Sequence, residues 1–121
     1  MKAVLLISHG SRFSQTEQEV KEFVVQLKQP SDIPIVEYAF LEIVRPNIPE
    51  GIDICVEKGA TKVIILLNFL NAGKHVDEDI PRIIDEARGK YPDVIFTITQ
   101  PVGKHDQIVK LFLDMIESSG Q

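Results

Sequence analysis

The sequence is poor in cysteine and contains no long apolar run. Its single cysteine, Cys55, excludes a disulfide framework and a cysteine-rich metal site. This usage is typical of a protein kept in a reducing cytoplasm. No apolar stretch approaches the ~20 residues that a membrane helix needs, and residues 1–8 lack the longer apolar core of a signal peptide. We therefore expect a cytoplasmic protein with no membrane partner.

Basic residues are neither abundant nor clustered. The chain carries 13 lysines and arginines against 18 aspartates and glutamates, for a formal net charge of −5. This balance argues against a nucleic-acid partner, which would require basic residues gathered on one face. With 121 residues, 44% of them hydrophobic, the composition is that of one ordinary globular domain, and we predict a single domain over residues 1–121.

Four short aliphatic runs predict β-strands. The first is closed by Ser8, His9 and Gly10, and the last is more polar at alternate positions and is followed by Pro101, as in an edge strand. The predicted strands cover residues 3–7, 35–41, 63–67 and 94–98.

Apolar residues recur at helical spacing after each of these strands, which predicts four helices. Pro30 is expected to stop the first helix and Gly59 to follow the second. The predicted apolar faces are Val20, Phe23, Val24 and Leu27; Ile48, Ile52, Cys55 and Val56; Ile80, Ile83, Ile84 and Ala87; and Ile108, Leu111, Phe112, Met115 and Ile116. The alternation predicts an α/β fold, a doubly wound open four-stranded parallel sheet in the order 2-1-3-4 with helices on both faces.

In such a sheet, ligands bind beyond the carboxyl ends of the strands, where the winding reverses between strands 1 and 3. His9 follows strand 1, Glu42 follows strand 2 and His75 lies beyond strand 3, at intervals of 33 residues. All three are thus expected at one edge of the sheet. Two imidazoles and a carboxylate bind cobalt, nickel or iron, and a neutral imidazole accepts protons near pH 7.

Residues around these three suit an anionic ligand. Gly10 permits a close backbone approach, the helix after Ser11 points its N-terminus at the site, and Arg12, Arg45 and Lys74 supply positive charge. Gly73 would let its loop close over a ligand, although loop glycines commonly serve turns alone.

Plainer interpretations exist for most of these residues. A lone histidine after a strand is usually a polar loop residue, and surface arginines and lysines are usually only solvated. We interpret His105 as a surface residue and Cys55 as a small core side chain. Asp77, Glu78 and Asp79 stand at a helix start, where acidic residues favour the helix dipole, so we assign them a structural role.

Several segments nevertheless occur together in a recognisable order. They are residues 6–12 (Leu-Ile-Ser-His-Gly-Ser-Arg), 39–42 (Ala-Phe-Leu-Glu) followed by Arg45 and Pro46, 69–76 (Phe-Leu-Asn-Ala-Gly-Lys-His-Val) and 79–81 (Asp-Ile-Pro). Together with the overall length, this set resembles the small sirohydrochlorin chelatases, which insert cobalt, nickel or iron into a tetrapyrrole.

The resemblance implies a role for each matching residue. His9 and His75 would hold the metal, His9 would also accept protons from the pyrrole nitrogens, and Glu42 would be the active-site carboxylate. Substrate contacts would come from Arg45 and from the loop of Leu70, Asn71, Ala72, Gly73, Lys74 and His75.

The resemblance also implies partners. The substrates would be a sirohydrochlorin-type tetrapyrrole and a divalent metal, first Co²⁺, with Ni²⁺ or Fe²⁺ as alternatives, and no cofactor would be permanently bound. Since related chelatases close a cleft between two lobes and this chain corresponds to one, a homodimer is expected. The product would enter the synthesis of cobalamin or a related tetrapyrrole.

The chain departs from the common pattern at Asn68, where many relatives carry proline, and it lacks the histidine-rich insertion of some nickel-handling members. Two other functions stay open. One is a metal or tetrapyrrole carrier without turnover. The other is a hydrolase using His9, although Ser11 lies in no G-x-S-x-G elbow.

Overall fold

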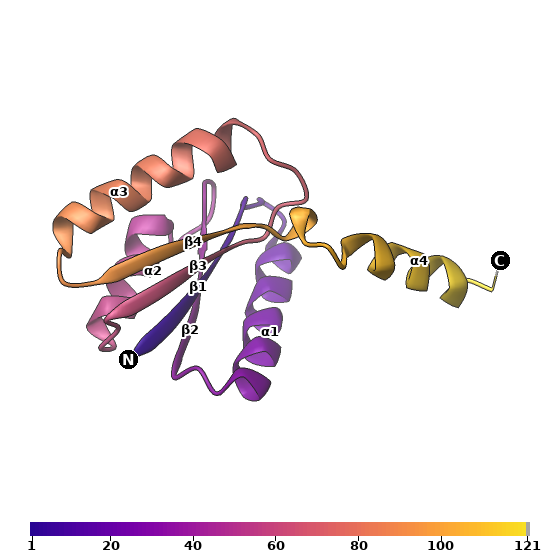
Figure 1. The fold of residues 1–121 in the computed structure, drawn as a ribbon, viewed down its shortest axis with the longest axis horizontal. Coiled ribbons are helices and arrows are strands. Elements are labelled where there is room, and N and C mark those ends of the chain that lie inside the picture. The colour runs from indigo at the N-terminus through magenta and orange to yellow at the C-terminus, as the bar shows by residue number, and fades with distance from the viewer. Residues whose placement is uncertain (121) are drawn as a thin grey trace.

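A computed structural model of the chain describes residues 1–120; Gln121, the last residue of the predicted domain, lies outside the described residues. Strands and helices alternate along the chain (Figure 1). The elements are β1 (Lys2–Ser8), α1 (Ser14–Ser31), β2 (Ile35–Phe40), α2 (Ile48–Glu57), β3 (Lys62–Leu67), the π-helical turn η1 (His75–Asp79), α3 (Ile80–Lys90), β4 (Ile95–Pro101), the 3₁₀ turn η2 (Val102–Lys104) and α4 (Ile108–Ser118).

The four strands form one parallel sheet in the order β2-β1-β3-β4, which confirms the predicted fold class and strand order. β1 lies in the middle with β2 and β3 as neighbours, and β4 is an edge strand, as its polar alternation predicted. Predicted and observed strands differ by at most three residues at an end. The first helix continues one residue past Pro30 and ends at Ser31, because proline in the last turn forfeits only one hydrogen bond.

Helices cover the two faces of the sheet unequally (Figure 1). α2 and α3 bury the face that carries Leu5, Ile7 and Ile65, and Cys55 contributes to this layer. Burial raises the pKa of the Cys55 thiol to about 12, which fits the predicted core side chain. α1 packs on the opposite face over Val4, Leu6 and Val36.

The last helix forms where it was predicted but does not bury its apolar side. None of the residues of α4, all of which are described, is buried, and Figure 1 shows the helix leading away from the sheet. The predicted apolar face of this helix therefore forms but does not pack on residues 1–120. Phe23, on the predicted apolar face of α1, is likewise 51% exposed. No helix among residues 1–120 is both long and apolar enough to cross a membrane.

Candidate functional site

His9 and Glu42 meet because the pairing of β1 with β2 continues beyond both strands. Leu41 N donates to Ser8 O at 2.9 Å, and Glu42 N donates to His9 O at 3.1 Å. The two side chains therefore leave the sheet edge together, and His9 Nε2 lies 2.8 Å from Glu42 Oε1. Both side chains are about half exposed, so a ligand can reach them.

Gly10 makes this close approach possible. Its φ of +107° is a conformation that L side chains rarely adopt, and a Cβ placed there would lie 1.9 Å from Glu42 O. The turn after β1 thus requires glycine both for its backbone angle and for the space beside Glu42. A side chain at this position would push the Glu42 backbone away from His9.

His75 begins the π-helical turn η1, which leads directly into α3. Its Nδ1 lies 2.8 Å from Asp79 Oδ2, one turn further along. An ionised carboxylate only accepts hydrogen bonds, so in the neutral imidazole this contact favours the tautomer with its proton on Nδ1, which leaves the lone pair of Nε2 for a ligand. The bond from His75, with the nearby Lys74 charge, lowers the pKa of Asp79. Single-turn π-helices frequently occur at functional sites.

The two histidines come from segments far apart in the sequence, His9 from the turn after β1 and His75 from the start of η1. Their ring centroids are 5.7 Å apart and the rings are inclined by 70°. The predicted convergence of His9, Glu42 and His75 at one edge is therefore present in the fold. Within residues 1–120, however, no three histidine, cysteine, aspartate or glutamate side chains are arranged to hold a metal ion. The two carboxylates instead orient the two imidazoles, one each.

Sequence reasoning missed the role of Asp79, which was assigned to the helix start. In the structure its carboxylate makes no capping bond; it pairs with His75 and lies 3.6 Å from Arg82 Nη2. The available signal was the spacing of histidine and aspartate four residues apart at a helix start, which places them on one face.

Asn68, where the chain departs from the family pattern, connects the end of β3 to β1. Its Nδ2 donates to Ser8 Oγ at 3.1 Å, and its N donates to Ile7 O at 2.9 Å. The end of β3 is thereby tied to the residue that precedes His9. A proline at this position would have no N–H to donate.

The predicted substrate-binding residues lie on exposed segments. The Arg45 guanidinium is paired with the Glu50 carboxylate, and its side chain is 85% exposed. Leu70, Asn71, Ala72, Gly73 and Lys74 form an exposed loop between β3 and η1. A Cβ on Gly73 would meet no atom within 4 Å, so this glycine serves no tight contact. Ser11 Oγ accepts from Phe13 N and, among residues 1–120, pairs with neither site histidine, which leaves the hydrolase interpretation without a nucleophile–base pair.

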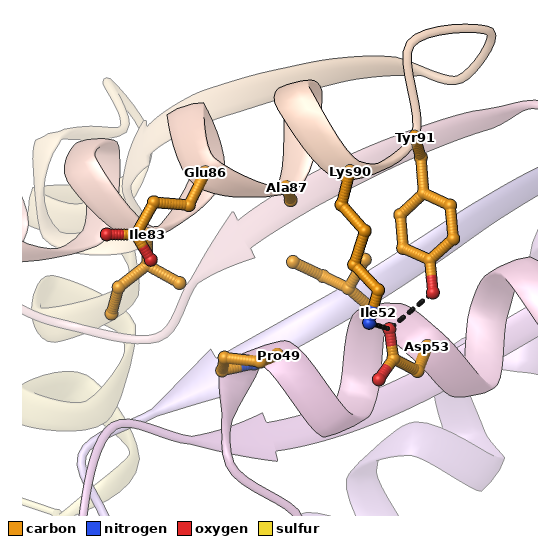
Figure 2. A pocket seen from close by; sticks show the side chains of 8 residues that line it. All are labelled: Pro49, Ile52, Asp53, Ile83, Glu86, Ala87, Lys90 and Tyr91. Atoms are coloured by element: carbon orange, nitrogen blue, oxygen red, sulfur yellow. Dashed lines mark hydrogen bonds and ion pairs between the residues drawn. The ribbon is translucent and has the colours of Figure 1, made fainter.

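A separate cavity of about 140 Å³ lies between α2 and α3 (Figure 2). Asp53 accepts from Tyr91 Oη at 2.5 Å and from Lys90 Nζ at 3.1 Å, which lowers the pKa of Asp53. None of the predicted site residues lines this cavity, and the Asp53 contacts hold α2 against the end of α3.

The CbiX family model matches residues 3–119. The chain belongs to the CbiX family. It is 40% identical to the sirohydrochlorin cobaltochelatase of Priestia megaterium over all of this chain and 39% of that protein. It is 31% identical to the sirohydrochlorin cobaltochelatase of Sulfolobus acidocaldarius over 98% of this chain and 93% of that protein.

A solved structure of this type shows the same fold. The sirohydrochlorin chelatase SirB from Bacillus subtilis subspecies spizizenii, in complex with cobalt, superimposes with a TM-score of 0.86 at 31% identity, covering 97% of this chain and 50% of SirB. The chain thus spans half the length of SirB and 39% of the length of the Priestia megaterium relative. The relatives of this chain therefore include proteins of about its own length and proteins at least twice as long.

Proposed function

We propose that this chain is a sirohydrochlorin chelatase that inserts a divalent metal ion, Co²⁺ in the first place, into the tetrapyrrole. The observation that carries the proposal is the pair of histidines, 5.7 Å apart at the carboxyl edge of the sheet, each held by its own carboxylate. Orientation of metal-binding imidazoles by carboxylates is a common feature of protein metal sites. The related cobaltochelatases support the choice of cobalt, and the related ferrochelatases support Fe²⁺ as an alternative. Ni²⁺ stays a second alternative on the family resemblance alone.

Metal insertion exchanges one divalent cation for two pyrrole N–H protons, so the site must supply both ligands and bases. In the proposed mechanism His75 presents Nε2 to the incoming metal, because Asp79 holds its Nδ1. His9 completes the two-histidine site. When the metal passes to the macrocycle, the lone pair of His9 is released and accepts a pyrrole proton.

Glu42 has two tasks in this scheme. Its carboxylate lies 2.8 Å from His9 Nε2, where it stabilises the imidazolium that forms when His9 is protonated. Being half exposed, it also exchanges protons with water and so restores His9 for the next turnover. Two protons leave the substrate for each metal inserted, and the His9–Glu42 pair is the route by which they leave the site.

The macrocycle is a polycarboxylate, so we expect positively charged side chains near the site to bind its carboxylates. We assign this contact to Arg45 and to the loop from Leu70 to His75, with Lys74 as its cation. Arg45 is paired with Glu50 in the free protein, so substrate carboxylates would replace Glu50 as its partner. Because this pair is largely exposed, the exchange costs little.

We infer that residues 1–121 form one lobe and that two copies close a cleft around the tetrapyrrole. Support comes from length, since SirB is about twice as long and its fold is matched by this chain over half. Cytoplasmic location and a place in cobalamin or related tetrapyrrole synthesis belong to the same proposal. No permanently bound cofactor is invoked.

Anaerobic absorbance spectroscopy of sirohydrochlorin with Co²⁺, Ni²⁺ or Fe²⁺ tests the proposal. The native protein is compared with no protein and with His9→Ala and His75→Ala variants whose folding is checked by circular dichroism. Catalytic metallation lost in both variants supports the chelatase and ranks the metals. Stoichiometric binding without acceleration overturns it in favour of a carrier, and hydrolysis of a generic phosphate ester would favour the hydrolase.

A further inference from the structure

Ile43, the residue after Glu42, adopts a backbone conformation that isoleucine avoids. Its φ is +75°, and Val44 N donates to Glu42 O at 2.8 Å across it, so residues 42–44 form a γ-turn. A γ-turn with positive φ at its centre is rare and strained, and a β-branched side chain is poorly suited to it. Within residues 1–120 the other positions with positive φ are three glycines and Asp32, which are residue types that tolerate this region.

The contacts around this turn hold it in the strained conformation. Glu42 N donates to His9 O at 3.1 Å, and Gly10 lies so close to Glu42 O that no side chain fits between them. Further along, Phe40 N donates to Pro46 O at 2.9 Å and closes the loop around the turn. Strained conformations persist only where the surrounding structure fixes them in this way, and they cluster at functional sites.

The Ile43 side chain contributes little to the packing of the chain. It is 57% exposed and belongs to neither of the two apolar clusters on the faces of the sheet, whereas Leu41 and Val44 pack against them. Glycine or asparagine would adopt this φ with less strain, and a polar side chain would suit the exposure better. Neither the backbone nor the core therefore accounts for an isoleucine at position 43, which leaves a contact outside residues 1–120 as the reason for it.

Exposed apolar side chains occur in each of the three turns that carry the site. Phe13 is 64% exposed after β1, and Ile43 after β2 and Leu70 after β3 are each 57% exposed. The same three turns supply the two histidines and Glu42. Apolar groups that surround a few polar ones suit a ligand that is itself part apolar and part polar.

A tetrapyrrole has this divided chemistry, because its carboxylates lie on the rim and its conjugated ring presents two flat, apolar faces. The cations assigned to the substrate above meet only the rim. The ring nitrogens lie at the centre of the macrocycle. They cannot reach the His9–Glu42 pair without bringing a ring face close to residue 43, whose Cα is about 3.8 Å from that of Glu42.

We propose that Ile43 is a substrate-contact residue that packs on a face of the tetrapyrrole ring and sets the position of the ring over His9 and Glu42. The strained turn keeps this side chain exposed beside the site instead of folded inward with its neighbours. The inference rests on the proposed function, since it requires the ring to approach the His9–Glu42 pair. It predicts opposite effects for a change at position 43: the free protein becomes more stable, and substrate binding becomes weaker.

The first test measures tetrapyrrole binding and stability in an Ile43→Asn variant. Binding of metal-free sirohydrochlorin is followed by absorbance without any metal. We expect its affinity to fall about ten-fold, as the loss of about half the burial of one isoleucine predicts. The urea midpoint should rise, because asparagine tolerates positive φ. Unchanged affinity, or a midpoint that falls together with the affinity, overturns the proposal.

Two further variants make this test specific. Ile43→Leu keeps an apolar side chain at the same place and should restore most of the affinity. Ile95→Asn is the matched control, because Ile95 is 62% exposed but lies at the amino end of β4, away from the site. Its affinity for metal-free sirohydrochlorin should equal that of the native protein. An equal loss in Ile95→Asn would show that the effect is not a contact of position 43.

The second test separates a ring-face contact from the charged contacts and from a contact between copies of the chain. From about 10 to about 500 mM NaCl the affinity ratio of native protein to Ile43→Asn should stay constant, whereas the deficit of Lys74→Gln should shrink, because salt screens only the charged contact. Sedimentation velocity should give the same assembly state for native protein and Ile43→Asn. A variant with altered assembly and native affinity for the ring would place Ile43 between copies and refute the proposal.

Failure of this inference and failure of the proposed function give different results. Since the binding assay contains no metal, a carrier that binds the ring without inserting metal would still show the Ile43→Asn defect. Metallation by the native chain, with unchanged ring affinity in Ile43→Asn, would retain the chelatase and refute the contact. A native chain that does not bind metal-free sirohydrochlorin refutes both.

Discussion

His9 and His75 differ in the ring nitrogen that their carboxylates hold. Glu42 lies on Nε2 of His9, whereas Asp79 lies on Nδ1 of His75. The carboxylates therefore contact opposite nitrogens of the two rings, and the remaining nitrogens are Nδ1 of His9 and Nε2 of His75. The proposed mechanism needs one histidine mainly to hold the metal and the other mainly to accept a proton. The different carboxylate contacts make the two imidazoles unequal, as this division of roles between His75 and His9 requires.

Asp79→Asn should weaken the metal site without removing a metal ligand. The amide has no charge to favour the Nδ1–H tautomer, so Nε2 of His75 becomes a poorer donor, and we expect a loss of about 10- to 100-fold in Co²⁺ affinity. Titration of the purified protein with Co²⁺ measures this. Asp77→Asn, two residues away on the same turn, is the matched control. Equal losses in both variants would show that only the local negative charge matters.

Gly10→Ala should disrupt both the fold locally and the His9–Glu42 pair. The added methyl would lie 1.9 Å from Glu42 O at a φ of +107°, so the turn must shift. We expect about 2 kcal/mol or more of lost stability and metallation reduced at least as far as in a Glu42→Ala variant. Urea unfolding and initial rates measure the two effects. Gly89→Ala, whose methyl meets no atom within 4 Å, should change neither for the worse.

At the scale of elements, the periodicity of apolar residues and the positions of proline and glycine predicted every strand and α-helix described in residues 1–120. The strand order followed from the rules for parallel βαβ units. The site edge followed as well, because each site residue comes soon after a strand. The sequence could not predict the backbone conformation of the loops. The contact between His75 and Asp79 depends on the π-helical conformation of residues 75–79, which lead directly into α3. The exposure of α4 was likewise not predicted, because the close approach of Gly103 to Leu70 in the turn before this helix is not encoded in any periodic pattern.

The start of α2 offers a test of how a loop end supports the site. Asn47 Oδ1 accepts from Glu50 N, and Glu50 Oε1 accepts from Asn47 N, each at 2.9 Å. This capping box lies at the end of the loop between β2 and α2, which carries Glu42. The same loop is also held by a hydrogen bond from Phe40 N to Pro46 O. Asn47→Ala should cost about 1 kcal/mol of unfolding free energy, measured in urea. Asn47→Asp should retain most of it, and an equal loss in both would refute the capping role.

At the scale of the whole molecule, the negative net charge of the protein disfavours association with the proposed anionic substrate. The chain carries a formal net charge of −5, and the tetrapyrrole substrate is a polycarboxylate. At low ionic strength the protein field extends about 30 Å and repels the substrate, whereas at 0.15 M salt it falls off within about 8 Å. Short contacts to Lys74 or Arg45 survive this screening better than the long-range repulsion does.

Metallation by this acidic protein should therefore speed up with added salt. Raising ionic strength from about 10 to about 150 mM should increase kcat/KM by about two- to five-fold, with the gain in substrate association rather than in the chemical step. Glu22→Lys with Glu57→Lys, both exposed and remote from the histidines along the sequence, moves the net charge from −5 to −1 and should flatten this dependence. If kcat/KM instead falls with salt in the native protein, local attraction by the site cations outweighs the global field. In that case Lys74→Gln should abolish the fall, and stopped-flow association rates at the two salt concentrations separate the alternatives.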